Sequence, residues 1–163
     1  MNGVVAFDSV HGNTKVVAEA IAGQLKADGH EVSLINVREA SPSGVTGDFI
    51  LVGSPTRGGR PTKEARAFVD GLDPSWSGKP AGVFDTIGPF SKDAEKRKKW
   101  MDTAYSGNKN AASKLKEQCA ERGIQVTSLL HVPVVGMMGP LAPEAADMAK
   151  DFAHKFAATL VRG

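Results

Sequence analysis

The sequence predicts an α/β fold in which helices cover both faces of a parallel β-sheet. Short β-prone apolar runs alternate with amphipathic helical patterns along the whole chain, without an internal repeat or a low-complexity tract. The runs at 4–7 and 49–52 are apolar throughout, which is typical of strands buried on both faces of such a sheet. With 163 residues, 41% of them hydrophobic, the chain can bury a core without disulfides or metals. We expect a doubly wound sheet in a single domain over residues 1–163.

Five β-prone runs supply the expected strands. The run at 31–37 alternates apolar and polar residues, as an edge strand does. The polar link 38–47 contains Pro42 and Gly44 and is expected to be a loop. In chain order the runs are 4–7, 31–37, 49–52, 81–84 and 126–132.

Four amphipathic segments are expected to be helices. The first runs from 14 to about 29 and the last from about 143 to 161. Thr62 can cap the second helix, because its hydroxyl can accept from a free backbone N–H of the first turn. In each segment apolar side chains recur at three- and four-residue spacing: Val17, Ala20, Ile21 and Leu25; Ala65, Phe68, Val69 and Leu72; Ala112, Leu115 and Cys119; Met148, Phe152, Phe156 and Leu160.

The loop Ser9–Thr14, between the first strand and the first helix, is the strongest candidate for a binding site. Its hydroxyls and backbone N–H groups lie at the positive end of the helix dipole, which favours a phosphate. The chain contains neither G-x-G-x-x-G nor G-x-x-x-x-G-K-[ST], so the dinucleotide fingerprint and the nucleoside triphosphate loop are both absent. A loop richer in hydroxyls than in lysine suits a single terminal phosphate. The alternative is an ordinary strand-to-helix turn capped by Ser9 or Thr14.

Two further loops are expected at the same edge of the sheet. Ligands of open α/β sheets bind at the carboxyl ends of the strands, where the strand order reverses. The loops after the third and fourth strands combine small residues with hydroxyl groups, so their backbones can approach a flat ligand closely. The candidate binding residues of the three loops are Ser9, Val10, His11, Gly12, Asn13, Thr14, Ser54, Pro55, Thr56, Arg57, Gly58, Gly59, Asp85, Thr86, Ile87 and Gly88.

These loops together resemble the flavin-binding loops of the flavodoxins. Ser9-x-x-Gly12-Asn13-Thr14 is similar to the phosphate loop of that family. The run 52–56 with Gly58-Gly59 is similar to its second loop, and 83–86 looks like the start of its third. The segment 139–141 before the last helix also occurs in sequences of this family. The resemblance implies strand order 2-1-3-4-5 and a non-covalent FMN cofactor. It places the phosphate in the first loop and the flavin ring between the other two.

The chain departs from the usual flavodoxin pattern at two positions. His11 stands where the family usually has Thr, and Arg57 stands where it often has Trp. An arginine can stack on an aromatic ring, although a solvated loop arginine is an equal alternative. Gly58 could turn its carbonyl toward the flavin. Candidates for a stacking aromatic are Phe90, Trp100 and Tyr105.

The charge balance also differs from that of the typically acidic flavodoxins. The chain has 20 Lys and Arg against 18 Asp and Glu, for a net charge of +2. Basic residues near the ring would favour the negatively charged reduced cofactor. The segment Phe90–Asn108 is long for a strand-to-helix connection and is rich in lysine. It is expected to be a lid, a docking element or a short helix that lays Trp100 on the body and its lysines in water.

Other function classes lack support in the sequence. The four histidines and Cys119 show no metal-ligand spacing, and a single cysteine excludes an internal disulfide. No nucleic-acid motif accompanies the lysine cluster. The chain enters its first strand at once and has no long apolar run, so we expect a cytoplasmic protein without a signal peptide or membrane segment. The favoured function is an FMN electron carrier acting between redox partner proteins. The alternative is an FMN-dependent NAD(P)H:quinone-type reductase of the same fold.

Overall fold

The computed structural model describes residues 1–104, 107–136 and 138–160, and its centre is a five-stranded sheet. Neighbouring strands are parallel, and their spatial order is β2-β1-β3-β4-β5, which confirms the expected order. The strand β2 lies at one edge, as its alternating sequence predicted. The strands are β1 (Asn2–Phe7), β2 (Glu31–Asn36), β3 (Phe49–Pro55), β4 (Pro80–Ile87) and β5 (Gln125–Pro133).

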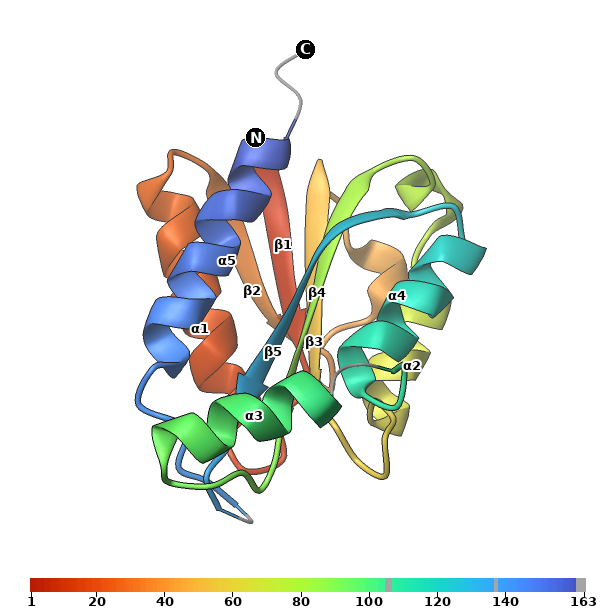
Figure 1. The fold of residues 1–163 in the computed structure, drawn as a ribbon. Coiled ribbons are helices and arrows are strands. Elements are labelled where there is room, and N and C mark those ends of the chain that lie inside the picture. The colour runs from red at the N-terminus through yellow and green to blue at the C-terminus, as the bar shows by residue number, and fades with distance from the viewer. Residues whose placement is uncertain (105–106, 137, 161–163) are drawn as a thin grey trace.

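Helices cover both faces of the sheet (Figure 1). The helices α1 (Asn13–Ala27) and α5 (Ala145–Thr159) lie on one face. The helices α2 (Lys63–Asp70) and α4 (Ala111–Glu121) lie on the other. Thr62 caps α2 as expected, with its Oγ1 accepting from the backbone N–H of Ala65 at 3.2 Å. A further helix, α3 (Ala94–Ala104), lies near the carboxyl ends of the strands in Figure 1.

The sheet separates two apolar cores, and this explains why its central strands are apolar throughout. Along β1, Val5 and Phe7 pack toward α1 and α5, whereas Val4 and Ala6 pack toward the opposite core. In the first core the rings of Phe49 and Phe156 meet edge to face, with centroids 5.6 Å apart.

Several element boundaries differ from the expected ones. The first helix begins at Asn13, one residue before the expected start, and ends at Ala27, two residues before the expected end. The link 38–47 contains a 3-10 turn, Pro42–Gly44, because proline fixes the backbone angle that such a turn needs. The last helix ends at Thr159, and residue 161 of the expected range lies outside the described residues.

The segment after β4 is a helix, but its inward side chain is not the expected one. Arg97 is 4% exposed, whereas Trp100 is 50% exposed, so the expectation that Trp100 lies on the body is wrong. The Arg97 guanidinium donates from Nε and Nη2 to the two carboxylate oxygens of Glu144, at 2.7 and 2.8 Å. Its Nη1 donates to the carbonyl oxygens of Ser91 and Lys92. The two bonds to Glu144 attach α3 to the start of α5, and the other two hold the segment just before α3. A tryptophan could not make these bonds.

In the described residues, no helix combines the length and the apolar character needed to cross a membrane.

Arg97→Gln should lower the free energy of unfolding by about 1–3 kcal/mol, because it removes charge-assisted hydrogen bonds from a buried position. Urea unfolding measures the change, and Lys98→Gln, an exposed neighbour on the same helix, is the control. The hydrogen bond from Arg97 lowers the pKa of Glu144. The stabilisation should therefore be complete above the ordinary pKa of a glutamate and disappear as the pH falls through the lowered value. Equal unfolding curves for the two variants would contradict the anchoring role of Arg97.

Candidate functional site

A cavity of about 490 Å³ opens at the carboxyl ends of the strands, between the loops that follow β1, β3, β4 and β5. Of the residues predicted from the sequence, those that line it are Ser9, Val10, His11, Asn13, Thr14, Pro55, Thr56, Arg57, Gly58, Thr86, Ile87 and Gly88. The cavity has a size typical of cofactor sites, and it lies where the strand order reverses.

The loop after β1 presents backbone N–H groups at the start of α1. Gly12 precedes the helix with a φ of 89°, a conformation that glycine adopts easily. The Ser9 hydroxyl oxygen accepts from the N–H of Gly12 at 3.0 Å and so stabilises the turn. The capping residue of α1 is Gly12, not Ser9 or Thr14 as the alternative interpretation expected. The N–H groups of Val10, His11, Asn13 and Thr14 have no partner within the described part of the chain. These donors, together with the positive end of the dipole of α1, suit an anion.

Two contacts tie this first loop to the other walls of the cavity. The hydroxyl oxygens of Thr14 and Thr86 lie 2.9 Å apart, and both residues are buried. The Asn13 amide donates from Nδ2 to the carbonyl oxygen of Met138 at 3.2 Å. The loops after β1, β4 and β5 therefore hold one another in place.

The loop after β3 is a two-residue hairpin turn. The N–H of Arg57 donates to the carbonyl of Arg60 at 2.8 Å, and the reverse bond is 3.0 Å. Gly58 and Gly59 between them have φ angles of 58° and 78°, the combination that a type I′ turn requires. The Arg57 Nη2 lies 3.3 Å from Nε2 of His11, so this turn meets the first loop across the cavity.

Four predicted residues lie beside the cavity without lining it. Gly12 forms the turn into α1, and Gly59 packs against Lys109. The Ser54 hydroxyl accepts from the N–H of Thr62 at 2.9 Å and so joins the two ends of the loop after β3. Asp85 is fully buried beneath the cavity.

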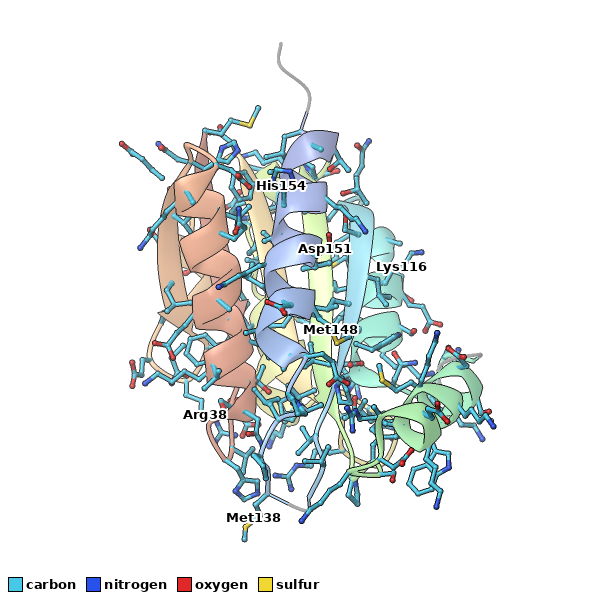
Figure 2. All side chains as sticks on the ribbon, turned by 60° about the vertical axis from the view of Figure 1, so that its left-hand side comes forward. Arg38, Lys116, Met138, Met148, Asp151 and His154 are labelled. Atoms are coloured by element: carbon cyan, nitrogen blue, oxygen red, sulfur yellow. The ribbon has the colours of Figure 1, made fainter. Side chains whose placement is uncertain are left out.

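Four residues of the lining were not predicted: Pro89, Val134, Gly136 and Met138. Three of them belong to a hairpin after β5, in which the N–H of Val135 donates to the carbonyl of Pro140 at 2.9 Å. The glycines and prolines of 133–140 were the sequence signal for this turn. Figure 2 shows Met138 at the loop end of the molecule, where its side chain is 67% exposed.

The described lining is uncharged except for Arg57 and, when protonated, His11. It contains no Asp or Glu and no phenylalanine, tyrosine or tryptophan. Of the three candidates for stacking, Phe90 directly follows the lining residue Pro89, and Trp100 is half exposed on α3. Tyr105 lies outside the described residues. The environment is therefore one that favours negative charge.

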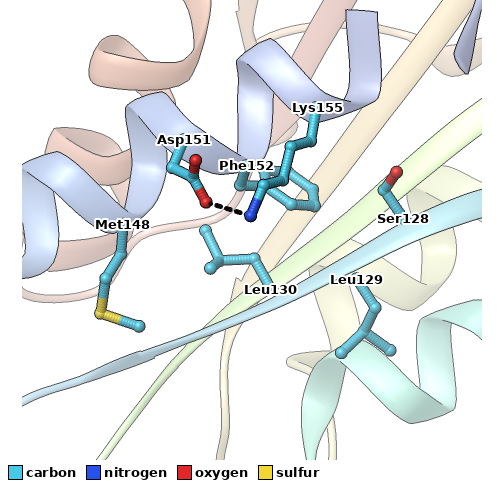
Figure 3. A pocket seen from close by; sticks show the side chains of 7 residues that line it. All are labelled: Ser128, Leu129, Leu130, Met148, Asp151, Phe152 and Lys155. Carbon is cyan, nitrogen blue, oxygen red and sulfur yellow. Dashed lines mark ion pairs between the residues drawn. The ribbon is translucent and has the colours of Figure 1, made fainter. Parts of the chain in front are cut away.

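Other features of the described chain do not make a comparable site. A hollow of about 390 Å³ lies between β5 and α5, where the ion pair of Asp151 and Lys155 (2.8 Å) borders mostly apolar side chains (Figure 3). No group of three metal-ligating side chains occurs in the described residues. Burial raises the pKa of the Cys119 thiol to about 11, so this thiol stays protonated and unreactive at neutral pH.

The chain is similar to known flavoproteins. The sequence model of the family described as "Flavodoxin domain" matches residues 4–132. The structure of oxidised flavodoxin 2 from Bacillus cereus matches with a TM-score of 0.73 and 27% identity, over 98% of this chain and all of that chain.

Two curated proteins share part of their length with this chain. A chain of Thermosynechococcus vestitus assigned the name diflavin flavoprotein A 2 is 33% identical over 108 residues, 61% of this chain. A chain of Methanosarcina barkeri named NAD(P)H dehydrogenase (quinone) is 31% identical over 119 residues, 52% of this chain. The matches span only 18% and 57% of those proteins.

Gly58→Ala should lower the free energy of unfolding by about 1–2 kcal/mol, because a side chain is strained at this positive φ. Gly58→Asn should cost less, since asparagine tolerates the left-handed region. The control is Gly44→Ala, where a Cβ meets nothing within 4 Å and no positive φ is required. Urea unfolding distinguishes the variants, and equal stability of Gly58→Ala and Gly44→Ala would contradict the proposed turn type.

Proposed function

The chain belongs to the flavodoxin family, and on that basis we propose that it is an electron carrier that shuttles electrons between redox partner proteins. FMN is the cofactor of this family and of this chain. When bound, FMN supplies a group that accepts and returns one or two electrons. The protein's part is to bind this group, orient it and tune the electrostatics around it.

The observation that carries the proposal is the set of unpartnered donors at the start of α1. The N–H groups of Val10, His11, Asn13 and Thr14 would hold the terminal phosphate of FMN, with the hydroxyl of Thr14 beside them. A monophosphate fits this arrangement because its charge is met by several aligned donors without a metal ion. The flavin ring would then extend between the second and third loops.

The second loop would set the electrostatics of the ring. Arg57 is the one permanent charge in the described lining, and it would stabilise the negative charge that reduction brings. Gly58 has no side chain that would restrict the orientation of its peptide. Its carbonyl oxygen could accept a hydrogen bond from an N–H of the ring.

The role of a carrier is supported by the rim of the cavity. Val10 and Met138 line the cavity and are also exposed, at 45% and 67%. Exposed apolar side chains beside a cofactor are suited to contact with a protein partner, since methionine and other apolar residues are enriched in the centres of interfaces. A partner that covers this rim could exchange electrons with the ring directly.

A reductase is the second candidate, and the positive lining favours it. Arg57 would attract an anionic donor such as NAD(P)H. The helix α3 lies near the carboxyl ends of the strands in Figure 1. The relative from Methanosarcina barkeri carries the name of an NAD(P)H dehydrogenase acting on quinone. In this case the purified protein would oxidise NAD(P)H and reduce the quinone without a partner protein.

Thr14→Val should weaken FMN binding to the apoprotein by about 1–3 kcal/mol, because it removes a hydroxyl from the phosphate loop. Titration calorimetry measures the effect. Thr46→Val, at an exposed threonine before β3 and so at the opposite edge of the sheet, is the control and should bind as the wild type does. Riboflavin, which lacks the phosphate, should bind wild type more weakly than FMN does. Equal affinities for riboflavin and FMN would contradict a phosphate site in this loop.

A carrier should receive electrons much faster from a flavodoxin reductase protein than from free NADH or NADPH. The measurement is stopped-flow reduction of the FMN-loaded protein under anaerobic conditions, with menadione as the quinone acceptor in a parallel assay. Fast turnover of NAD(P)H and menadione by the purified protein alone would contradict the proposed carrier role and support the reductase.

A further inference from the structure

A buried aspartate–histidine pair lies directly behind the cavity. Asp85, at the end of β4, is 0% exposed, and its carboxylate oxygens lie 2.9 and 3.0 Å from Nδ1 of His131 on β5. His131 is 14% exposed, so the pair reaches the surface through the imidazole. A carboxyl group without solvent is costly unless it is paired or protonated.

The surroundings of Asp85 supply few other charges. The backbone N–H of Ala112, at the start of α4, donates to Oδ2 at 3.0 Å. The hydroxyl of Thr56 contributes a further hydrogen bond from the loop after β3, and Ser54 is the neighbour in register on β3. Among the described residues, His131 is the ionisable side chain that acts on Asp85. Burial raises the pKa of Asp85 above the usual value of a carboxyl group, against the lowering effect of these bonds.

The pair is separated from the cavity by a single layer of side chains. Thr56 hydrogen-bonds to Asp85 and also lines the cavity. Thr86, the next residue along β4, lines the cavity as well. A negative charge that enters the cavity therefore acts on the pair through a region of low dielectric constant. Such a charge strengthens proton binding by neighbouring groups.

We propose that the Asp85–His131 pair binds a proton when the cofactor is reduced and releases it when the cofactor is reoxidised. The inference rests on the proposed function. The electron comes from the donor protein and the proton from solvent, so one positive charge offsets one negative charge. The proton is held between a carboxylate oxygen of Asp85 and Nδ1 of His131, and it belongs to the pair rather than to either residue.

A second aspartate–histidine pair offers a matched control. Asp28 and His154 make a contact of 3.1 Å, but His154 is largely exposed, and Figure 2 shows it at the end of the molecule opposite Met138. A charge in the cavity is screened from this pair by solvent and distance. Replacing Asp28 should therefore leave the redox properties of the cofactor unchanged.

The experiment measures one-electron potentials of the FMN-loaded wild type and of Asp85→Asn, His131→Gln and Asp28→Asn as a function of pH. Proton uptake is followed in parallel with an indicator dye in weak buffer. Wild type and Asp28→Asn should take up more protons on reduction than Asp85→Asn and His131→Gln, by up to one. When one extra proton is taken up with one electron, the equilibrium constant of reduction changes tenfold per pH unit. The reduction potential then shifts by about 59 mV per pH unit.

The outcomes separate this inference from the proposed function. If wild type fails to bind FMN, the proposed function fails. If all four proteins bind FMN and show the same proton uptake and pH dependence, the pair only joins β4 to β5 and α4, and the inference is overturned. If the buried variants do not fold, infrared difference spectra between oxidised and reduced wild type, labelled with ¹³C-aspartate, test the proton uptake. A changed carboxyl band supports the proton uptake and an unchanged spectrum contradicts it.

Discussion

The reversal of strand order between β1 and β3 is the constraint on which the site depends. After these two neighbouring strands the chain leaves the sheet toward opposite faces, into α1 and α2, so a crevice opens between the two connections. Asp8, at the end of β1, is buried outside the cavity lining, and its Oδ1 accepts from Nε of Arg38 at 2.6 Å. Burial alone would raise the pKa of Asp8, but hydrogen bonds from Arg38 and Thr62 lower it overall. The carboxylate therefore stays charged and joins β1 to the segment after β2.

Contacts between loops turn this crevice into a shaped cavity. The hydroxyls of Thr14 and Thr86 join the first loop to the third, and Asn13 joins it to the hairpin after β5. Gly88 allows the loops after β4 and β5 to approach closely, because a Cβ there would lie 2.5 Å from the carbonyl oxygen of Val134. Loops held by one another in this way keep their donors oriented before a ligand arrives, which reduces the entropy lost on binding. The same packing places Asp85 one side chain behind the cavity wall.

The sequence was sufficient to predict the strands, their order and the three main loops, because these follow from local patterns and from a family resemblance. The period of the apolar residues separates helices from strands, and glycines with hydroxyl residues mark the strand ends. Contacts between residues far apart in the chain could not be predicted from these local patterns. Nothing near Arg97 in the sequence indicates that its partner is Glu144, 47 residues later. For this reason the sequence pattern predicts Trp100, not Arg97, on the inward side of the helix. For the same reason the contact between Asp85 and His131 and the hairpin wall at Met138 could not be predicted.

The central claim is that the Ser9–Thr14 loop binds the phosphate of FMN through its backbone donors. The most direct measurement is a titration of ¹⁵N-labelled apoprotein with FMN, and separately with riboflavin, followed through the backbone amide resonances. With FMN, the amides of Val10, His11, Asn13 and Thr14 should move to the shifts of strongly hydrogen-bonded groups, and with riboflavin they should move far less. Equal changes with the two ligands, or changes confined to the hollow between β5 and α5, would contradict the account.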